Sequence, residues 1–202
     1  MRTQTKEIQH NLTPKKAHQI LLEGNKRFVN NKKAPRDLKA QVYETQYGQY
    51  PFAVILSCID SRVPAELIFD QGIGDIFSVR VAGNVINNDI LGSMEYGCKV
   101  GGSKILVVMG HSNCGAVTAA CNHVELGNIT PLLAKIKPSM NIVSSSKVFS
   151  DTQIDKVSRL NVTQSIDIIR QESPILNQME KAGAIEIIGA FYSVENGTVT
   201  FM

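Results

Sequence analysis

Two short stretches of the sequence carry side chains that can bind a metal ion. Cys58 follows one apolar run, and His111 and Cys114 follow a second apolar run further along the chain. Two thiolates and one imidazole are ligands that zinc prefers in proteins. Three protein ligands leave one tetrahedral position free, and an open position distinguishes a catalytic zinc site from a structural one. The pattern predicts a zinc site that solvent can enter.

A carboxylate and a guanidinium follow the first thiol. Asp60 and Arg62 are two positions apart, so on extended backbone both side chains can point the same way. An adjacent arginine keeps a carboxylate ionised and oriented. Near a metal, Asp60 either accepts a hydrogen bond from solvent on the metal or fills the open position itself. Without a metal, the two residues form a plain ion pair.

The runs before these side chains are typical of buried β-strands. The sequence predicts strands over 52–57 and 105–109, with the reactive side chains just after each. In a parallel α/β sheet the carboxyl ends of the strands lie at one edge, where ligands bind. We therefore expect Cys58 and His111 to meet there.

Each fragment also has a simpler interpretation. A cysteine at the end of a strand is commonly a small buried hydrophobic residue, and a His-x-x-Cys pair alone is a weak metal signal. A cysteine nucleophile paired with His111 is another alternative. The metal hypothesis is favoured because both fragments follow predicted buried strands.

Alternating strands and helices predict the fold class. Further strands are expected over 76–82 and 184–191, and Asn196 with Gly197 predicts a hairpin that returns residues 198–201 antiparallel. This alternation is typical of α/β proteins with a mainly parallel sheet. We expect a mainly parallel four-stranded sheet with a C-terminal antiparallel edge strand, flanked by helices.

The N-terminal region is predicted to be a helical arm. Thr13 is expected to cap a helix that begins at the following proline, and a second short helix is expected over 39–48. The sequence does not decide whether this arm packs on its own domain or on a neighbouring subunit. We expect a single domain over 1–202, with the arm over 1–48 and an α/β core over 49–202.

Three later segments complete the predicted fold. Asp89 is expected to cap a helix that reaches about residue 100. The serine-rich segment 138–151 is expected to be the most mobile loop. A long amphipathic helix is predicted to follow it, and Ser173 is predicted to begin another helix.

The composition is that of a globular domain without a disulfide framework. The chain has 202 residues, of which 43% are hydrophobic, so it can bury a core without a structural metal. Its four cysteines are too few for a disulfide scaffold, and we expect them to be reduced.

The sequence lacks signals for membrane insertion and export. No apolar run approaches the roughly 18 residues of a membrane helix, and residues 1–11 lack the apolar segment of a signal peptide. We expect a cytoplasmic protein; a periplasmic protein after removal of its signal would have the same sequence. Residues 2–39 hold ten Lys or Arg against three acids. These charges are spread without interleaved aromatic residues, so nucleic-acid binding is not expected.

Two motifs resemble those of a known enzyme family. Cys58-Ile59-Asp60-Ser61-Arg62 followed by His111-Ser112-Asn113-Cys114-Gly115 resembles the signature of the β-class carbonic anhydrases. Further segments resemble family segments in the same order: 22–28, 62–66, 80–84 and 93–96. The resemblance covers nearly the whole chain and is weakest over 138–151.

The resemblance implies a zinc-dependent reaction. It implies that Cys58, His111 and Cys114 bind one Zn²⁺ per chain and that Asp60 and Arg62 form a catalytic dyad beside it. Zinc-bound hydroxide would then attack carbon dioxide, and bicarbonate would leave as water replaces it. Because thiolate ligands donate more charge to zinc than imidazoles do, we expect activity to rise on the alkaline side.

The resemblance also implies a substrate pocket shared between subunits. Gln49, Phe77 and Tyr96 match family positions that contact substrate from the partner subunit, so a homodimer or a dimer of dimers is expected. The backbone N–H of Gly115, at the start of a helix, is a candidate anion donor. Without the family resemblance, Gln49 would be interpreted as a loop amide, and Phe77 and Tyr96 as core aromatics.

One departure from the family bears on the open position. Some members have a second, inhibitory bicarbonate site that uses a tryptophan where this chain has Ile55, together with an arginine that Arg80 matches. Because half of that site is missing, we expect the open type, with water rather than Asp60 on zinc near neutral pH.

Two alternative functions would also use a bound zinc ion. One is hydrolysis of a carbon dioxide analogue, carbonyl sulfide or carbon disulfide, on the same scaffold. The other is a non-catalytic zinc-stabilised interaction module, whose closed tetrahedral site would make Asp60 irrelevant to any rate.

Overall fold

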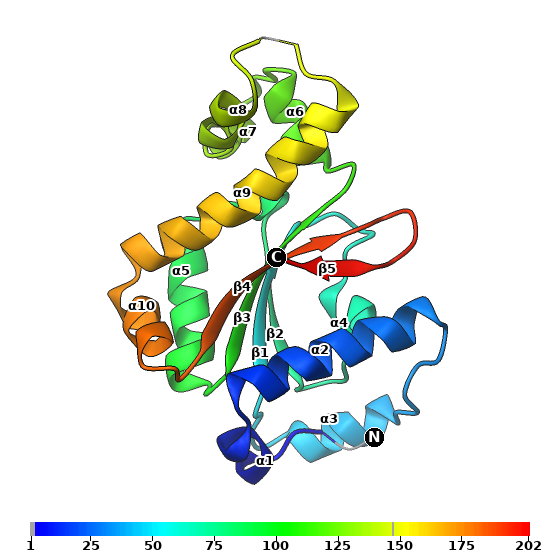
Figure 1. Ribbon diagram of the computed structural model, residues 1–202. Coiled ribbons are helices and arrows are strands. Elements are labelled where there is room, and N and C mark those ends of the chain that lie inside the picture. Colours follow the sequence, from blue (N-terminus) through cyan, green and yellow to red (C-terminus); the bar gives the residue numbers. More distant parts are fainter. Residues whose placement is uncertain (1–2, 147) are drawn as a thin grey trace.

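A twisted five-stranded sheet forms the centre of the computed structural model, which describes residues 3–146 and 148–202. The strands, in the spatial order β2-β1-β3-β4-β5, are β1 (Ala53–Ser57), β2 (Ile76–Arg80), β3 (Ile105–His111), β4 (Glu186–Tyr192) and β5 (Val199–Phe201). The first four are parallel, and β5 pairs antiparallel with β4. The predicted mainly parallel sheet with an antiparallel C-terminal edge strand is confirmed (Figure 1).

The register of the sheet brings the carboxyl ends of its central strands together. Ser57, the last residue of β1, lies opposite Arg80 of β2 and Met109 of β3. Cys58 therefore begins a loop at the same edge of the sheet where β3 ends at His111. All residues of β1 and β3 are buried, which is why both strands read as continuous apolar runs.

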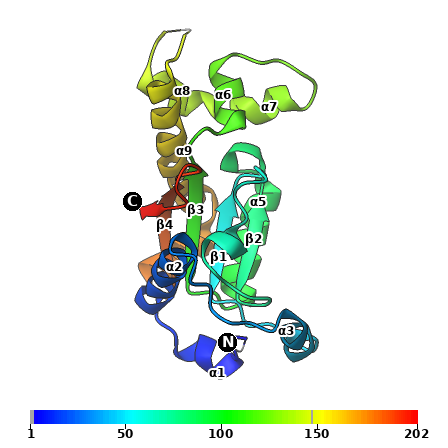
Figure 2. The same ribbon diagram turned by 90° about the vertical axis from the view of Figure 1, so that its right-hand side faces the viewer.

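Helices cover both faces of the sheet and its carboxyl edge. The described helices, including the short 3-10 element η1 and the π-helical element η2, are α1 (Lys6–Asn11), α2 (Pro14–Val29), α3 (Leu38–Thr45), α4 (Ala65–Ile68), η1 (Ala82–Asn84), α5 (Asn88–Glu95), η2 (Tyr96–Val100), α6 (Gly115–Cys121), α7 (Ile129–Ala134), α8 (Lys137–Val143), α9 (Asp151–Glu172) and α10 (Pro174–Lys181). One core cluster joins α2 and α4 to one face of the sheet, and another joins α5, α9 and α10 to the other face. Figure 2 shows α6, α7 and α8 gathered beyond the carboxyl ends of the strands.

The N-terminal arm packs on its own domain. Ala17 and Leu21 of α2 are fully buried in the core cluster that includes Ile55 of β1. Gly24 of the same helix lies so close to the α4 region that a Cβ there would be 1.8 Å from the carbonyl oxygen of Phe69. A side chain at this position would force the arm away from the sheet, so glycine is retained despite its helix cost of about 1 kcal/mol.

A buried ion-pair cluster fixes the segment after α2. The Asp70 carboxylate is almost completely buried and lies 2.5 Å from both the Arg27 Nε and the Arg36 Nη1 atoms. It also accepts a hydrogen bond from the backbone N–H of Ala34. Because each carboxylate oxygen has a charged partner, burial of this carboxylate is compensated.

Two local predictions need correction. Asn87, rather than Asp89, caps α5 by accepting a hydrogen bond from the backbone N–H of Ile90, and Asp89 lies in the first turn. The segment 138–151 is not a single loop, because α8 continues to Val143 and α9 begins at Asp151. Lys147, which the loop prediction included, lies outside the described residues. The helices α1 and α7 are additional to those predicted.

The helices were also compared with the requirements of a membrane span. Within 3–146 and 148–202, none is both long enough and apolar enough to cross a bilayer.

Candidate metal centre

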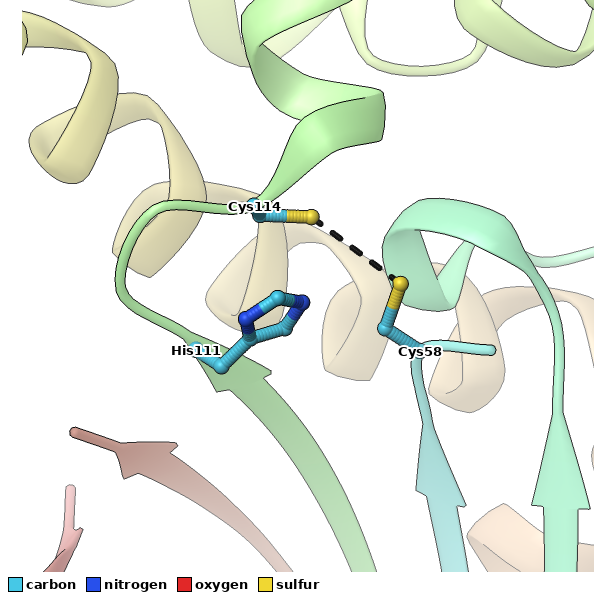
Figure 3. Close-up of side chains that lie close together, drawn as sticks. All are labelled: Cys58, His111 and Cys114. Atoms are coloured by element: carbon cyan, nitrogen blue, oxygen red, sulfur yellow. Dashed lines mark hydrogen bonds between the residues drawn. The ribbon is translucent and has the colours of Figure 1, made fainter. Parts of the chain in front are cut away.

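Three buried side chains meet where the central strands end. The possible ligand atoms of Cys58, His111 and Cys114 all lie within 4.8 Å of one another. The two sulfur atoms are 4.0 Å apart, close to the ~3.8 Å that tetrahedral zinc with Zn–S bonds of about 2.3 Å requires. Figure 3 shows the imidazole ring and both sulfur atoms turned toward one another. The fold therefore brings the three predicted metal ligands together.

The hydrogen bonding of His111 fixes which ring nitrogen is available. Its Nδ1 atom lies 3.0 Å from the carbonyl oxygen of Ser112, so Nδ1 carries the proton and donates it. The Nε2 atom is buried and has no hydrogen-bond partner. A buried nitrogen with a free lone pair beside two sulfur atoms fits a divalent metal ion. The neighbouring carbonyl is the partner that commonly orients a metal-binding imidazole.

The two thiols are prepared for metal binding by their proximity. A hydrogen bond from Cys114 lowers the pKa of Cys58 to about 4, against the opposing effect of burial. The same contact raises the pKa of Cys114, because the two sulfurs share one proton. For comparison, burial alone raises the pKa of Cys98 to about 12. A divalent cation binding here would displace the shared proton and take both sulfurs as thiolates.

A strained turn carries the ligands from β3 into α6. Asn113 adopts a left-handed conformation with φ of 54°, which asparagine tolerates better than most residues. Cys114 then precedes the first helical residue, Gly115, as the cap position of α6. Ser112 anchors the turn to β4 and the loop after it, because its N–H donates to Tyr192 and its hydroxyl accepts from Val194.

Asp60 and Arg62 form a bidentate ion pair beside the metal-ligand cluster. The Nε and Nη2 atoms of Arg62 donate to the two carboxylate oxygens of Asp60 at 2.9 and 2.8 Å. Nη2 also donates to the carbonyl oxygen of Asn113, which ties the pair to the turn between His111 and Cys114. The hydrogen bond from Arg62 lowers the pKa of Asp60 to about 2. Among the described residues, the metal-ligand cluster does not include Asp60.

Two backbone contacts at this site escaped sequence reasoning. Arg80, considered above only as half of an inhibitory site, donates from Nε to the Cys58 carbonyl and from Nη2 to the Asp60 carbonyl. The backbone N–H of Gly83 donates to the Cys58 sulfur at 3.3 Å. The alignment of the last residue of β2 with the last residue of β1 could have suggested the first contact, but a main-chain donor leaves no sequence signal.

An apolar cavity of 560 Å³ adjoins the metal-ligand cluster. Cys58, Asp60 and Gly115 line the part of the cavity nearest to the cluster. The remaining lining is mostly aliphatic: Ile59, Ala82, Ala116, Ala119, Asn128, Ile129, Leu132 and Leu133. Such a cavity favours a small apolar molecule over a charged one.

The other predicted substrate residues lie away from this cavity in the same chain. Gln49 is exposed in the loop before β1. Phe77 and Tyr96 contact each other edge to face at 6.3 Å between ring centroids and line a separate hollow. Tyr96 is 58% exposed, so it is not a core aromatic. Ile55, at the position where some family members have tryptophan, is fully buried in the core.

Comparison with known proteins identifies the family. The sequence model of the carbonic anhydrase family matches residues 53–199. Carbonic anhydrase 2 of Mycobacterium tuberculosis is 34% identical over 193 residues, covering 93% of this chain and 92% of the relative. The crystal structure of the β-carbonic anhydrase CafA of Aspergillus fumigatus matches with a TM-score of 0.72 and 26% identity, covering 81% of each chain.

The chain belongs to the β-class carbonic anhydrase family. A third relative, the carbonic anhydrase of Mycolicibacterium smegmatis, is 33% identical over 196 residues and spans 94% of this chain and 93% of its own length. The prediction that the chain is a carbonic anhydrase of this class is confirmed. The segment matched by the carbonic anhydrase family model contains the whole metal-ligand cluster and the Asp60–Arg62 pair.

Proposed function

We propose that the chain catalyses the reversible hydration of carbon dioxide to bicarbonate and a proton, with one zinc ion per chain. The ligands would be the Cys58 and Cys114 Sγ atoms and the His111 Nε2 atom. The observation that carries this proposal is the buried cluster of two proton-sharing thiols beside an unpartnered imidazole nitrogen. Zinc bound there supplies an activated water as the nucleophile at near-neutral pH.

Asp60 would orient that nucleophile without taking its proton. A carboxylate whose pKa is held near 2 remains an acceptor throughout the neutral range, so Asp60 can receive a hydrogen bond from the water and direct the oxygen lone pair at substrate. The proton itself passes to solvent or buffer. Arg62 engages both carboxylate oxygens, which supports a site in which Asp60 stays off the metal and the fourth position remains open.

The apolar cavity would hold carbon dioxide next to the nucleophile. Its aliphatic lining excludes competing water and suits a neutral, nonpolar substrate. Once bicarbonate has formed, its charge is poorly matched to that lining, which favours its departure. We infer that the Gly115 N–H, which has no partner within its helix because it is at the first helical position, donates to the developing anion.

The proposal predicts a specific pH dependence. The rate of hydration is expected to climb from pH 6 to pH 9, because the zinc-activated water would lose its proton in that range. Asp60 becomes protonated only as the pH falls through about 2, so it contributes no step above pH 5. Stopped-flow measurement of kcat/KM across pH checks this. A second, acidic step above pH 5 that disappears in Asp60→Asn would contradict the assignment.

We further propose that a second copy of the chain completes each substrate pocket, as a homodimer or a dimer of dimers. Gln49, Phe77 and Tyr96 lie away from the cavity of their own chain and are partly or largely accessible. Exposed side chains on one copy could therefore reach the cavity of another. Gln49 would hydrogen-bond substrate, and the two aromatic rings would line the pocket.

Mixed dimers test this shared pocket. Gln49→Ala is expected to lower kcat/KM about tenfold, the effect of losing one hydrogen bond of about 1.4 kcal/mol. A dimer of one Gln49→Ala chain and one His111→Ala chain should regain about half of the wild-type rate, because one of its two sites is then intact. If Gln49 acted within its own chain, the mixed dimer would retain only about a twentieth. Gln46→Ala, an exposed glutamine in the preceding turn, serves as control.

The function itself is tested by metal analysis and substrate comparison. One equivalent of zinc per chain with rapid carbon dioxide hydration supports the proposal. Side-by-side assays with carbonyl sulfide and carbon disulfide identify the preferred substrate, and faster sulfide release than carbon dioxide hydration would reassign it. Bound zinc without turnover of any of the three substrates would instead indicate a structural metal.

A further inference from the structure

The long helix α9 buries polar side chains on the face that covers the metal centre. Its buried residues include Ser158, Asn161 and Ser165, interspersed with Val157, Val162, Ile166 and Ile169. Serine and asparagine are weak helix formers, and burying a polar group is costly unless a hydrogen bond compensates it. Their presence at consecutive turns of this face therefore requires specific partners.

All three partners are backbone carbonyls, one of the proposed ligand His111 and two of the turn that contains Gly83. The Ser158 hydroxyl donates to the carbonyl of His111 itself at 3.1 Å. The Asn161 Nδ2 atom donates to the carbonyl of Gly83 at 2.9 Å. The Ser165 hydroxyl donates to the carbonyl of Asn84 at 3.4 Å. The helix thus contacts the end of β3, which carries His111, and the Gly83 turn, which contacts Cys58.

The Gly83 turn connects α9 to a metal ligand. The N–H of Gly83 donates to the Cys58 sulfur, while its carbonyl accepts from Asn161. Gly83 and Asn84 both have left-handed backbone conformations, with φ of 67° and 44°. Glycine has more backbone freedom than any other residue, so its N–H points at the sulfur only if something else fixes the turn. Asn161, which is 4% exposed, constrains Gly83 directly by bonding to its carbonyl, and Ser165 holds the residue that follows.

We propose that Asn161 is a positioning residue of the metal centre. It holds Gly83 so that the Gly83 N–H stays hydrogen-bonded to the Cys58 sulfur, and this bond withdraws charge from the thiolate that binds the metal. Groups that hydrogen-bond to metal ligands commonly change metal affinity or activity 10- to 100-fold. The inference rests on the proposed metal site, and it goes beyond that site by assigning a function to a residue that does not touch the metal.

Substitution of the metal by cobalt(II) tests this role through the absorption of the thiolate–cobalt bonds, whose wavelength a purely structural residue would not affect. In the cobalt protein, Asn161→Ala is expected to shift the thiolate-to-cobalt charge-transfer band to longer wavelength, because a sulfur without its hydrogen bond gives up charge more easily. Release of cobalt to a chelator should be about tenfold faster, because the Cys58 sulfur is no longer held in position and this outweighs its stronger donation. Ser139→Ala is a matched control, since Ser139 is fully buried and makes a 2.9 Å bond to Gln164 of α9 but touches neither turn.

The outcomes separate this inference from the proposed function. A wild-type chain that takes up no cobalt overturns the proposed function and the inference with it. A wild-type chain with a charge-transfer band that is unchanged in Asn161→Ala overturns the inference alone. If Asn161→Ala does not fold, Asn161→Leu, which fills the volume and favours a helix, is expected to give the same shift.

A measurement on the wild type gives an independent test. In protein loaded with cadmium-113, the Gly83 amide proton is expected to show scalar coupling to the metal through the Cys58 sulfur. Selective nitrogen-15 labelling of glycine makes this amide observable. Absence of the coupling in metal-loaded wild-type protein would overturn the inference.

Discussion

Replacing His111 by alanine is expected to abolish stoichiometric zinc binding and to reduce carbon dioxide hydration at least about a thousandfold. The imidazole Nε2 atom is the one nitrogen that the cluster of described residues offers to a metal ion, and without zinc the pKa of the water nucleophile stays far above neutrality, as in bulk water. The two thiols would remain, but two ligands hold zinc far more weakly than three. Elemental analysis and stopped-flow hydration assays on the same preparations measure both effects.

Cys121→Ala is the matched control for this experiment. Cys121 is as buried as the ligand Cys114 and lies on the same helix, but it is not part of the cluster. Burial in the same core cluster raises the pKa of its thiol, and the side chain packs among Val117, Ala120 and Leu133. The control should keep full zinc content. A His111→Ala protein that retains both zinc and activity would refute the assigned ligand set.

Asp60→Asn is expected to lower kcat about a hundredfold while the zinc content stays unchanged. The substitution preserves shape but replaces one acceptor oxygen with an amide that donates, so the nucleophilic water loses the group that orients it. Positioned acid–base groups typically contribute 10²- to 10⁴-fold, and the lower end applies because Asp60 only accepts a hydrogen bond. The two-pronged contact with Arg62 would also be lost.

Two further variants show whether the loss of kcat in Asp60→Asn is specific to the site. Asp167→Asn changes an exposed carboxylate on α9, away from both the metal cluster and the hollow of Phe77 and Tyr96, and should leave kcat unchanged. Arg62→Lys keeps the charge but cannot engage both carboxylate oxygens and Asn113 at once, so it should give an intermediate loss. If Asp60→Asn lost its zinc instead of its rate, Asp60 would be a ligand rather than an orienting group.

The central strands and the ligand cluster were predictable because their signals are local. A fully buried parallel strand is a continuous apolar run, and residues 53–57 and 105–109 are such runs. In a parallel sheet the carboxyl ends of the strands lie at one edge, so Cys58 and His111 could be predicted to lie close together. The Asn196–Gly197 hairpin was equally local, because its turn chemistry is sufficient to reverse the chain.

The errors arose where tertiary contacts override local preference. The segment 138–143 appears loop-like because of its serine and proline, yet it forms a helix that buries Met140 in the cluster around Cys114 and Val157. Asn87 and Asp89 are both good helix caps, and only the backbone decides between them. The partners of Arg80 are main-chain carbonyls that every residue possesses, so only its position opposite the end of β1 could have indicated this contact.

The residues of the substrate pocket could not be predicted from local sequence patterns for a different reason. Gln49, Phe77 and Tyr96 have no feature of spacing that links them to the metal ligands, and the single chain does not bring them to the cavity. These three residues were predicted to contact substrate only because of the family resemblance. Their assignment therefore stays a prediction until the mixed dimers are measured.

The path of the chain between the ligands has a consequence for the order of assembly during biosynthesis. The strand β2 and the helix α5 separate Cys58 from His111 along the chain. A nascent polypeptide therefore exposes Cys58 long before the other two ligands have been synthesised. Long-range pairing of parallel strands is slow compared with local helix formation. Zinc capture by the three proposed ligands is accordingly expected late in maturation, after β1 and β3 have paired and the sheet has organised the site.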